Sequence, residues 1–194
     1  MLVPLISRFL RAFPAIELEL VVDDALVDMV SSGFDAGVRF GESVAADMIA
    51  VAIGPRHRFA VVGSPDHFEH NPRPLSPHDL KTHPCIRYRF ASGSFYRWEF
   101  ERKGRKVSVE VHGALTLDAP SLIREATLEG VGLAYLVDWR IAADVEAGRV
   151  VRVLEDWMPS SSGLSLYYPG HRYVPAGLRA FVGVVREATR APPI

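Results

Sequence analysis

The segment at residues 34–41 constrains the fold of this chain more than any other. It reads Phe-Asp-Ala-Gly-Val-Arg-Phe-Gly, which predicts a buried strand over residues 35–40 that carries one charged side chain, Arg39. Upstream, residues 16–20 alternate apolar side chains with glutamate, the pattern of a half-exposed strand, and residues 2–13 have the apolar spacing of a helix. Strands that alternate with helices predict an α/β fold with parallel sheets, in which ligands bind beyond the strand ends. The first hypothesis is therefore a small-molecule sensor.

The same patterns recur along the rest of the chain. Further strands are expected at residues 48–53, 57–62, 85–90, 96–101, 106–111, 115–117, 133–136, 150–154 and 164–168. Further helices are expected after the Ser-Pro pair at 64–65 and at residues 26–30, 78–81, 120–129, 139–147 and 175–189. A turn at residues 102–105 joins two of the strands into a hairpin. Linkers near residues 62–64 and 159–163 indicate two lobes, with the chain crossing out and back.

Composition narrows the classes of protein to which this chain can belong. Of its 194 residues, 48% are hydrophobic and 23% are charged, which is typical of a globular protein with a packed core. The formal net charge of −1 gives no drive toward nucleic acid or anionic lipid. Cys85 is the only cysteine, so neither an intrachain disulfide nor a cysteine-based zinc site is expected, which fits a cytoplasmic location. Neither a signal peptide nor a membrane span is expected.

Nine short segments, in this order, resemble the effector-binding domain of LysR-type transcriptional regulators. They are residues 4–14, 34–41, 61–65, 80–86, 98–100, 130–134, 148–151, 166–169 and 179–182. The resemblance implies two Rossmann-like α/β lobes of the type II periplasmic-binding-protein kind, with a cleft between them. Lobe I is expected to comprise residues 1–62 and 164–194, and lobe II residues 63–163.

The resemblance also implies a binding module without catalytic residues or cofactor. A small metabolite, expected to bear a carboxylate, would bind in the cleft and change the geometry of a homodimer or homotetramer. That change would reach DNA only through helix-turn-helix domains, which this chain lacks. The family's first strand, which precedes the helix at Leu2, is likewise expected to be missing from lobe I, and Val137 stands where the family often has a proline.

In lobe I, the resemblance points to Arg39 and Phe40 at the cleft. The Arg39 guanidinium is expected either to pair with a carboxylate of the effector or to form a structural ion pair with one of three nearby acids, Asp35, Glu42 and Asp47. Tyr168 is expected to form a wall of the same cleft, and the alternative is a solvent-exposed turn. Both alternatives stay open from the sequence.

Lobe II supplies five further candidates. Ser64 offers a hydroxyl and a helix-start N–H to an anion, and the alternative is a plain N-cap before Pro65. Alternation along the strand means that only one parity of residues faces the cleft. Arg87 or Arg89 is expected there together with Phe90, and Arg87 is the preferred arginine. Asp118 is expected to cap the helix at 120–129, with direct ligand contact as the alternative. The backbone of Ala119 would then face the cleft.

Subunit contacts are expected on two helices, because members of the family commonly pack the first helix of one subunit against the helix at 120–129 of another. Val3 and Leu10 are the candidates on the first helix, and Leu122 and Ile123 on the second. The alternative is that these side chains belong to the core. Residues 122, 123 and 126 are also expected to face inward within their own helix.

Several other chemistries are disfavoured by spacing. His57, His67, His70, His78 and His83 match no metal-ligand pattern and are interpreted as surface residues, so no metal site is expected. Cys85 has no nearby base and is interpreted as a buried strand residue. Three rival functions stay open: a transport-type solute-binding protein, a dehydratase-like enzyme on the same fold, and a truncated product without function.

Overall fold

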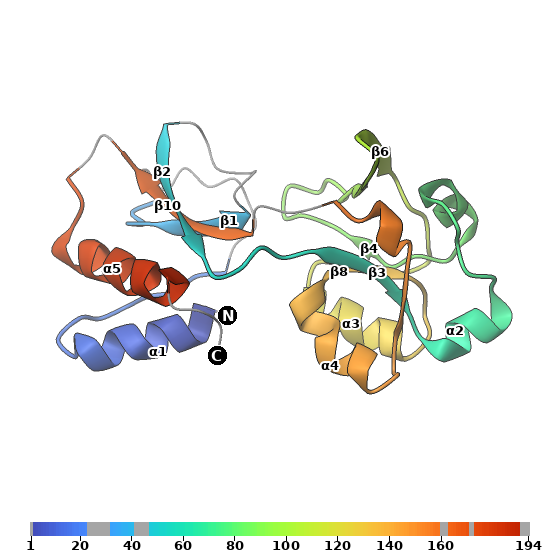
Figure 1. Ribbon diagram of the computed structural model, residues 1–194, viewed down its shortest axis with the longest axis horizontal. Helices are drawn as coiled ribbons and strands as arrows, with labels where there is room; N and C mark the ends of the chain where they lie inside the picture. The colour runs from blue at the N-terminus through green and yellow to red at the C-terminus, as the bar shows by residue number, and fades with distance from the viewer. Residues whose placement is uncertain (1, 23–31, 41–46, 160–162, 171–172, 191–194) are drawn as a thin grey trace. The chain divides into compact units, whose positions relative to one another are not determined.

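The computed structural model describes residues 2–22, 32–40, 47–159, 163–170 and 173–190 (Figure 1). The described residues form two compact units. Unit 1 contains the described residues before position 58 and after position 162, and unit 2 contains residues 58–159. Each unit has its own sheet and its own buried apolar core, so each is described by itself.

Unit 1 is a three-stranded antiparallel sheet with two helices packed together. Its central strand, β10 (Leu164–Pro169), pairs with β1 (Gly37–Phe40) on one side and β2 (Met48–Ile53) on the other. The helices α1 (Leu2–Ala12) and α5 (Ala176–Arg190) lie side by side (Figure 1). Phe9 of α1 is buried, and its ring packs edge-on against that of Phe181 of α5, with 5.1 Å between the ring centroids.

Unit 2 is built around β3 (Phe59–Gly63), which pairs antiparallel with β8 (Ala134–Val137) and β9 (Val151–Val153). A second pair, β4 (Arg87–Tyr88) and β7 (Thr116–Leu117), is parallel. It joins the first sheet through a parallel bridge between Cys85 and Leu133. The other elements are α2 (Pro65–His70), η2 (Pro77–Thr82), β5 (Trp98–Arg102), β6 (Arg105–Val109), α3 (Pro120–Leu128), α4 (Asp138–Glu146) and η3 (Glu155–Trp157).

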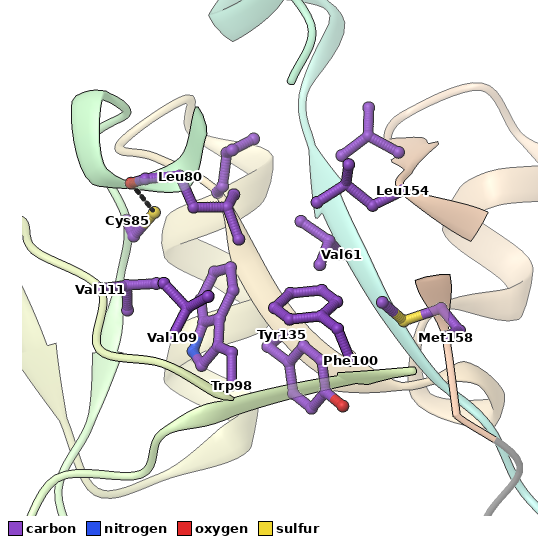
Figure 2. Packing of buried hydrophobic residues seen from close by; sticks show 12 residues of the cluster. Val61, Leu80, Cys85, Trp98, Phe100, Val109, Val111, Tyr135, Leu154 and Met158 are labelled. Atoms are coloured by element: carbon purple, nitrogen blue, oxygen red, sulfur yellow. Dashed lines mark hydrogen bonds between the residues drawn. The ribbon is translucent and has the colours of Figure 1, made fainter. Parts of the chain in front are cut away.

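The larger core of unit 2 lies between the β5–β6 hairpin and the sheet, where aromatic rings from both meet (Figure 2). Trp98 and Phe100, on the buried face of β5, pack against the ring of Tyr135 on β8. The Tyr135 hydroxyl donates a hydrogen bond of 2.8 Å to the backbone oxygen of Glu99, which satisfies its polar end. Burial raises the pKa of the Cys85 thiol to about 12, so this side chain behaves as a small apolar residue.

Most predicted elements are confirmed, including the hairpin, whose turn residues Lys103 and Gly104 both have positive φ. The strand at residues 16–20 is wrong. That stretch is extended but unpaired, because in the described part of unit 1 no strand forms a ladder with it. Its alternate residues Leu18 and Leu20 consequently stay exposed. The helix expected at residues 26–30 lies outside the described residues.

The expected strand direction is wrong for unit 1 and right only in part for unit 2. Unit 1 is antiparallel because β10 returns from the far end of the chain and runs against both of its neighbours. In unit 2, β4, β7, β8 and β9 run one way, and β3 alone runs against them. Alternation of helices and strands detects crossover helices, but it does not detect a strand that enters from a distant part of the sequence.

Two helices of unit 2 end in the same way. After α3, the N–H groups of Gly130 and Val131 donate to the carbonyls of Thr127 and Ala126. After α4, Gly148 and Arg149 repeat this pattern on the carbonyls of Val145 and Asp144. Gly130 has a φ of 77° and Gly148 of 68°, so both ends are Schellman motifs with a left-handed glycine.

A buried carboxylate ties these two helices together. Asp144 is fully buried on α4 and accepts bonds of 2.5 and 2.6 Å from the Arg124 guanidinium on α3, and bonds of 2.5 and 2.9 Å from that of Arg149. These hydrogen bonds, with that from Arg124 foremost, hold the pKa of Asp144 below its usual range. Both carboxylate oxygens are therefore paired, and α3, α4 and the turn that precedes β9 are held in one arrangement.

We expect Asp144→Ala to destabilise unit 2 by about 2 kcal/mol, because it removes charge-assisted hydrogen bonds from a buried site. Urea denaturation at neutral pH measures the change. Glu110→Ala, which breaks the exposed pair of Glu110 with Arg97, is the control and should cost about 0.5 kcal/mol or less. The contribution of Asp144 is present above the ordinary carboxyl pKa and is lost as the pH falls through its lowered folded value. Equal losses in the two variants would contradict this role.

Candidate functional site

The strand directions of unit 2 place its predicted ligand residues on two opposite sides of the sheet, where strands begin or end. These two sides are called edges here. Phe90 follows β4, to which Arg87 itself belongs, and Asp118 follows β7, which is parallel to β4. Ser64 follows β3, which runs the other way, so it lies at the opposite edge. The structure therefore brings Arg87, Phe90, Asp118 and Ala119 to one edge, called here the carboxyl edge, and does not bring Ser64 there.

At the carboxyl edge, the position of Arg87 is fixed by two neighbours. Its Nε donates to the Thr116 hydroxyl at 3.1 Å, and its guanidinium lies over the ring of Phe95 at 4.0 Å from the centroid. Arg89 is more exposed and donates to the backbone oxygen of Gly93. Of the two arginines, Arg87 is the one held half-buried in a defined orientation.

Aromatic rings line the approach from this edge to the core. Phe90 lies between Tyr88, at 5.2 Å, and Tyr96, at 5.8 Å between ring centroids. Tyr96 in turn contacts Phe59 and Tyr135. The edge thus combines a fixed cation with half-buried aromatic faces, which suits a small ligand with one anionic and one apolar end.

The start of α3 lies at the same edge. Its N-cap residue is Ala119, which has no side-chain oxygen, and Pro120 occupies the first turn. The capping role expected for Asp118 is wrong, because the helix begins one residue later and the exposed Asp118 side chain makes no capping bond. The N–H groups of this first turn consequently lack a side-chain cap, an arrangement that favours an anion.

Unit 1 supplies Arg39 from β1. Its guanidinium lies 5.8 Å from the ring centroid of Tyr167, which is directly opposite Gly37 in the β1–β10 ladder. Of the three acids expected as ion-pair partners of Arg39, Glu42 lies outside the described residues. Phe40, the next residue of β1, is half-buried.

Tyr168 belongs to the core of unit 1, so the alternative of a solvent-exposed turn is wrong for this residue. Along β10, Leu164, Leu166 and Tyr168 all pack toward that core, so the intervening Tyr167 takes the other face. Tyr167, which the sequence interpretation missed, is therefore the residue that shares a face with Arg39. Strict alternation from Leu164 is the signal that identifies it.

Ser64 acts as the N-cap of α2, as one of its two predicted roles required. It is buried, and its hydroxyl accepts a 3.1 Å hydrogen bond from the backbone N–H of His67. The interpretation of all five histidines as surface residues is wrong for three of them, since His57, His67 and His83 are buried. A proline-rich loop suggests exposure, but His67 lies on α2 and His83 ends η2, while His57 comes shortly before β3.

The subunit-contact candidates differ in exposure. Val3 is 70% exposed, Leu122 48% and Leu10 38%, whereas Ile123 is 3% exposed and lies in a core cluster. The prediction that Leu122 faces inward is therefore wrong, and the prediction for Ile123 is confirmed. Ala126 is partly buried against the same cluster.

A separate groove of about 280 Å³ on unit 2 is lined by residues 73–75, 102 and 152–157. The predicted ligand residues of the described chain do not line it. Two of its arginines already face carboxylates, Arg102 with Asp156 at 3.5 Å and Arg152 with Asp138 at 3.1 Å. The groove thus has little unopposed charge with which to hold an anion. Among the described residues, no cluster of three or more metal-ligating side chains occurs.

Comparison with known proteins assigns the family. The model of the LysR substrate binding domain matches residues 1–190. This chain belongs to that family. The LysR domain is 40% identical over 185 residues to the uncharacterized HTH-type transcriptional regulator YcaN of Escherichia coli K12, covering 95% of this chain and 60% of YcaN. It is 39% identical over 182 residues to the regulator PgrR of the same organism, covering 93% and 61%.

Solved structures agree on the fold of the LysR domain. The regulatory domain of AphB from Vibrio vulnificus matches with a TM-score of 0.79 and 24% identity, covering 96% of this chain and 91% of that one. CrgA from Neisseria meningitidis matches with a TM-score of 0.75 and 24% identity, covering 96% and 63%. The predicted family and the type II periplasmic-binding-protein-like fold are confirmed. The LysR domain spans about 60% of the length of these curated regulators.

Two further observations bear on the LysR domain. Helices long and apolar enough to cross a bilayer are not found among the residues described. The relatives that match over most of the chain are named as transcriptional regulators.

We expect Gly37→Ala to destabilise unit 1 by about 1–3 kcal/mol, because a Cβ at this position would lie 2.6 Å from the ring carbons of Tyr167. The displaced ring would also lose its contact with Arg39. Thermal unfolding measures the effect. Gly183→Ala in α5 is the matched control, since a Cβ there meets no atom within 4 Å, and it should be neutral or stabilising. A destabilisation by Gly183→Ala equal to that of Gly37→Ala would contradict the argument.

Proposed function

We propose that this chain is the effector-sensing part of a LysR-type transcriptional regulator that binds a small carboxylate. Units 1 and 2 would be lobes I and II, except that residues 58–62, expected in lobe I, belong to unit 2. The effector would lie between them, with the carboxyl edge of unit 2 on one side. The observation that carries this proposal is Arg87, which lies over Phe95 and is bonded to Thr116 of β7, the strand that leads to the uncapped start of α3.

The chemistry of the carboxyl edge favours an anion with an apolar part. A carboxylate would accept hydrogen bonds from Arg87 and from N–H groups of the first turn of α3. Phe90 and its neighbouring tyrosines would bury the apolar part. From unit 1, Arg39 and Tyr167 would supply a second cation and an aromatic wall. Ser64 is left out of this site, because it lies at the other edge of the sheet.

The regulatory step needs only a difference in affinity. An effector that binds better to one arrangement of the two lobes shifts the population toward it. In an oligomer, that shift would change the spacing of DNA-binding domains outside this chain. We propose a homodimer or homotetramer in the cytoplasm, without catalytic turnover, as the working assembly.

The proposal predicts that carboxylates stabilise the protein through both arginines. A panel of acetate, succinate and benzoate analogues is screened by thermal unfolding. A ligand at 100 times its Kd adds about 2.7 kcal/mol to the free energy of unfolding. In a chain of this size, that raises the melting temperature by roughly 5–10 °C. Arg39→Ala and Arg87→Gln should each abolish the rise. Arg97→Ala, at an exposed arginine of the hairpin paired with Glu110, is the control and should retain it. A full rise in both site variants would refute the assignment.

Subunit contact makes a separate prediction. If the exposed side chains Val3 of α1 and Leu122 of α3 meet in an oligomer, Leu122→Glu should lower the mass measured by light scattering, because a charge would be buried in an apolar contact. Val131→Glu, at another exposed apolar residue of unit 2, is the control. An unchanged mass in Leu122→Glu would remove this helix from the interface.

A further inference from the structure

Two buried histidines meet at the edge of unit 2 opposite the carboxyl edge. His67 lies on α2 and is 3% exposed, and His83 follows η2 and is 7% exposed. Their ring centroids are 6.3 Å apart. Nε2 of His67 and Nδ1 of His83 are both buried without a hydrogen-bond partner among the described residues. Buried polar atoms are normally paired, so this pair requires an explanation.

The polar groups around the pair favour the protonated, charged form of the two rings. From α2, Asp66 favours a charge on His67, and the backbone of Gly130, after α3, acts in the same direction. From η2, Asp79 favours a charge on His83, but that carboxylate already accepts hydrogen bonds of 2.9 Å from the N–H groups of Leu75 and Ser76. The buried Cys85 thiol stays protonated and adds no charge.

Burial dominates this balance. Desolvation is the main reason that the pKa of each histidine lies below its usual value, and the charge of His83 lowers the pKa of His67 further. Both rings are therefore neutral at neutral pH. Protonation of either one places a cation in a site that excludes water, and protonation of both places two cations side by side.

The two elements that the pair joins are short. α2 and η2 have six residues each. α2 is held by the Ser64 cap and by a 2.9 Å bond from the Asn71 amide to the His67 carbonyl. Helices this short have little stability of their own, so opening them costs far less than unfolding the Trp98–Tyr135 core.

We propose that His67 and His83 form an acid-sensitive latch between α2 and η2, which is closed when both rings are neutral and opens locally when they are protonated. The rest of unit 2 stays folded when the latch opens. The latch lies at the opposite edge from Arg87. It is joined to the carboxyl edge by α3, whose end at Gly130 lies against Ser64 and Asp66. Any effect on the effector rests on the proposed function, but the latch itself does not.

The sign of the pH dependence follows from proton linkage. The open state binds protons near the ordinary histidine pKa of about 6.5, whereas the closed state binds them only at lower pH. Between pH 7.5 and pH 5.5, each ring that stays neutral when closed favours opening by about tenfold. The two rings together give about a hundredfold. The latch is thus fully closed at a pH above the ordinary histidine pKa, and it opens as the pH falls below that pKa.

Hydrogen exchange of the whole chain, with a chelator present to exclude metal binding, tests the latch. After correction for intrinsic exchange rates, protection of residues 64–71 and 76–84 should fall about ten- to hundredfold from pH 7.5 to pH 5.5. Residues 98–109 of the hairpin should change less than about threefold. A loss of equal size in the hairpin would mean global unfolding and would overturn the proposal.

Substitutions assign the effect to the two rings. In the double variant His67→Gln and His83→Asn, neutral amides replace the two unpaired nitrogens, so the pH dependence at residues 64–71 should disappear. His78→Asn, at an exposed histidine of η2, is the matched control and should behave as the original chain does. The same pH dependence in the double variant and the original chain would overturn the latch.

A measurement on the unaltered protein covers the case in which the double variant fails to fold. The ring protons of His67 and His83 are followed by NMR through the same pH range. The latch requires that they titrate below the ordinary value, and in step with the amide signals of residues 64–71. Titration that leaves those amide signals unchanged would refute local opening.

Discussion

The pairing of β3 on both of its sides is the constraint on which unit 2 depends. Val61 and Val62, in the middle of this strand, have no exposed surface, and they pack into different core clusters on the two faces of the sheet. Because β3 is the only strand of this sheet that runs against the others, it also decides which residues reach which edge. The capped start of α2 lies at one edge, and Arg87 and the start of α3 lie at the other.

This separation assigns different chemistry to the two edges. At the carboxyl edge, Arg87 lies over the ring of Phe95, and α3 begins without a side-chain cap. At the opposite edge, Ser64 satisfies the helix start internally and the histidines are covered. The two helix starts therefore differ within one unit: α2 is capped by the Ser64 side chain, whereas Ala119, the N-cap of α3, makes no side-chain cap bond.

Local signals predicted most elements of this fold, because they depend on neighbours in the sequence. The Ser64–Pro65 helix start and the Lys103–Gly104 turn require only short-range contacts, and both are confirmed. The strand at residues 16–20 failed because a ladder needs a partner that periodicity does not reveal. The direction of β10 failed for a similar reason, since its neighbours come from a distant part of the chain.

The candidate site was harder to predict than the fold, because each residue type has several local uses. Ser64 was expected at the ligand site from its helix-start position, yet the direction of β3 carries it to the other edge. Tyr168 is the tyrosine predicted at the cleft, although the alternation from Leu164 places Tyr167 on the same face as Arg39. The position of Asp118 in the sequence is typical of a helix N-cap. The backbone angles decide which residue is the N-cap, however, and here that residue is Ala119.

Unit 2 buries polar groups in two contrasting ways. Asp144 is charged and buried, but both of its oxygens are bound by guanidiniums, so burial stabilises one arrangement of α3 and α4. His67 and His83 are neutral and buried, and each leaves one nitrogen unpaired. A satisfied charge makes its surroundings rigid, whereas an unsatisfied titratable ring makes its surroundings depend on pH. Asp144 binds Arg124 of α3, whereas the end of that helix at Gly130 lies against Ser64 and Asp66, close in sequence to His67.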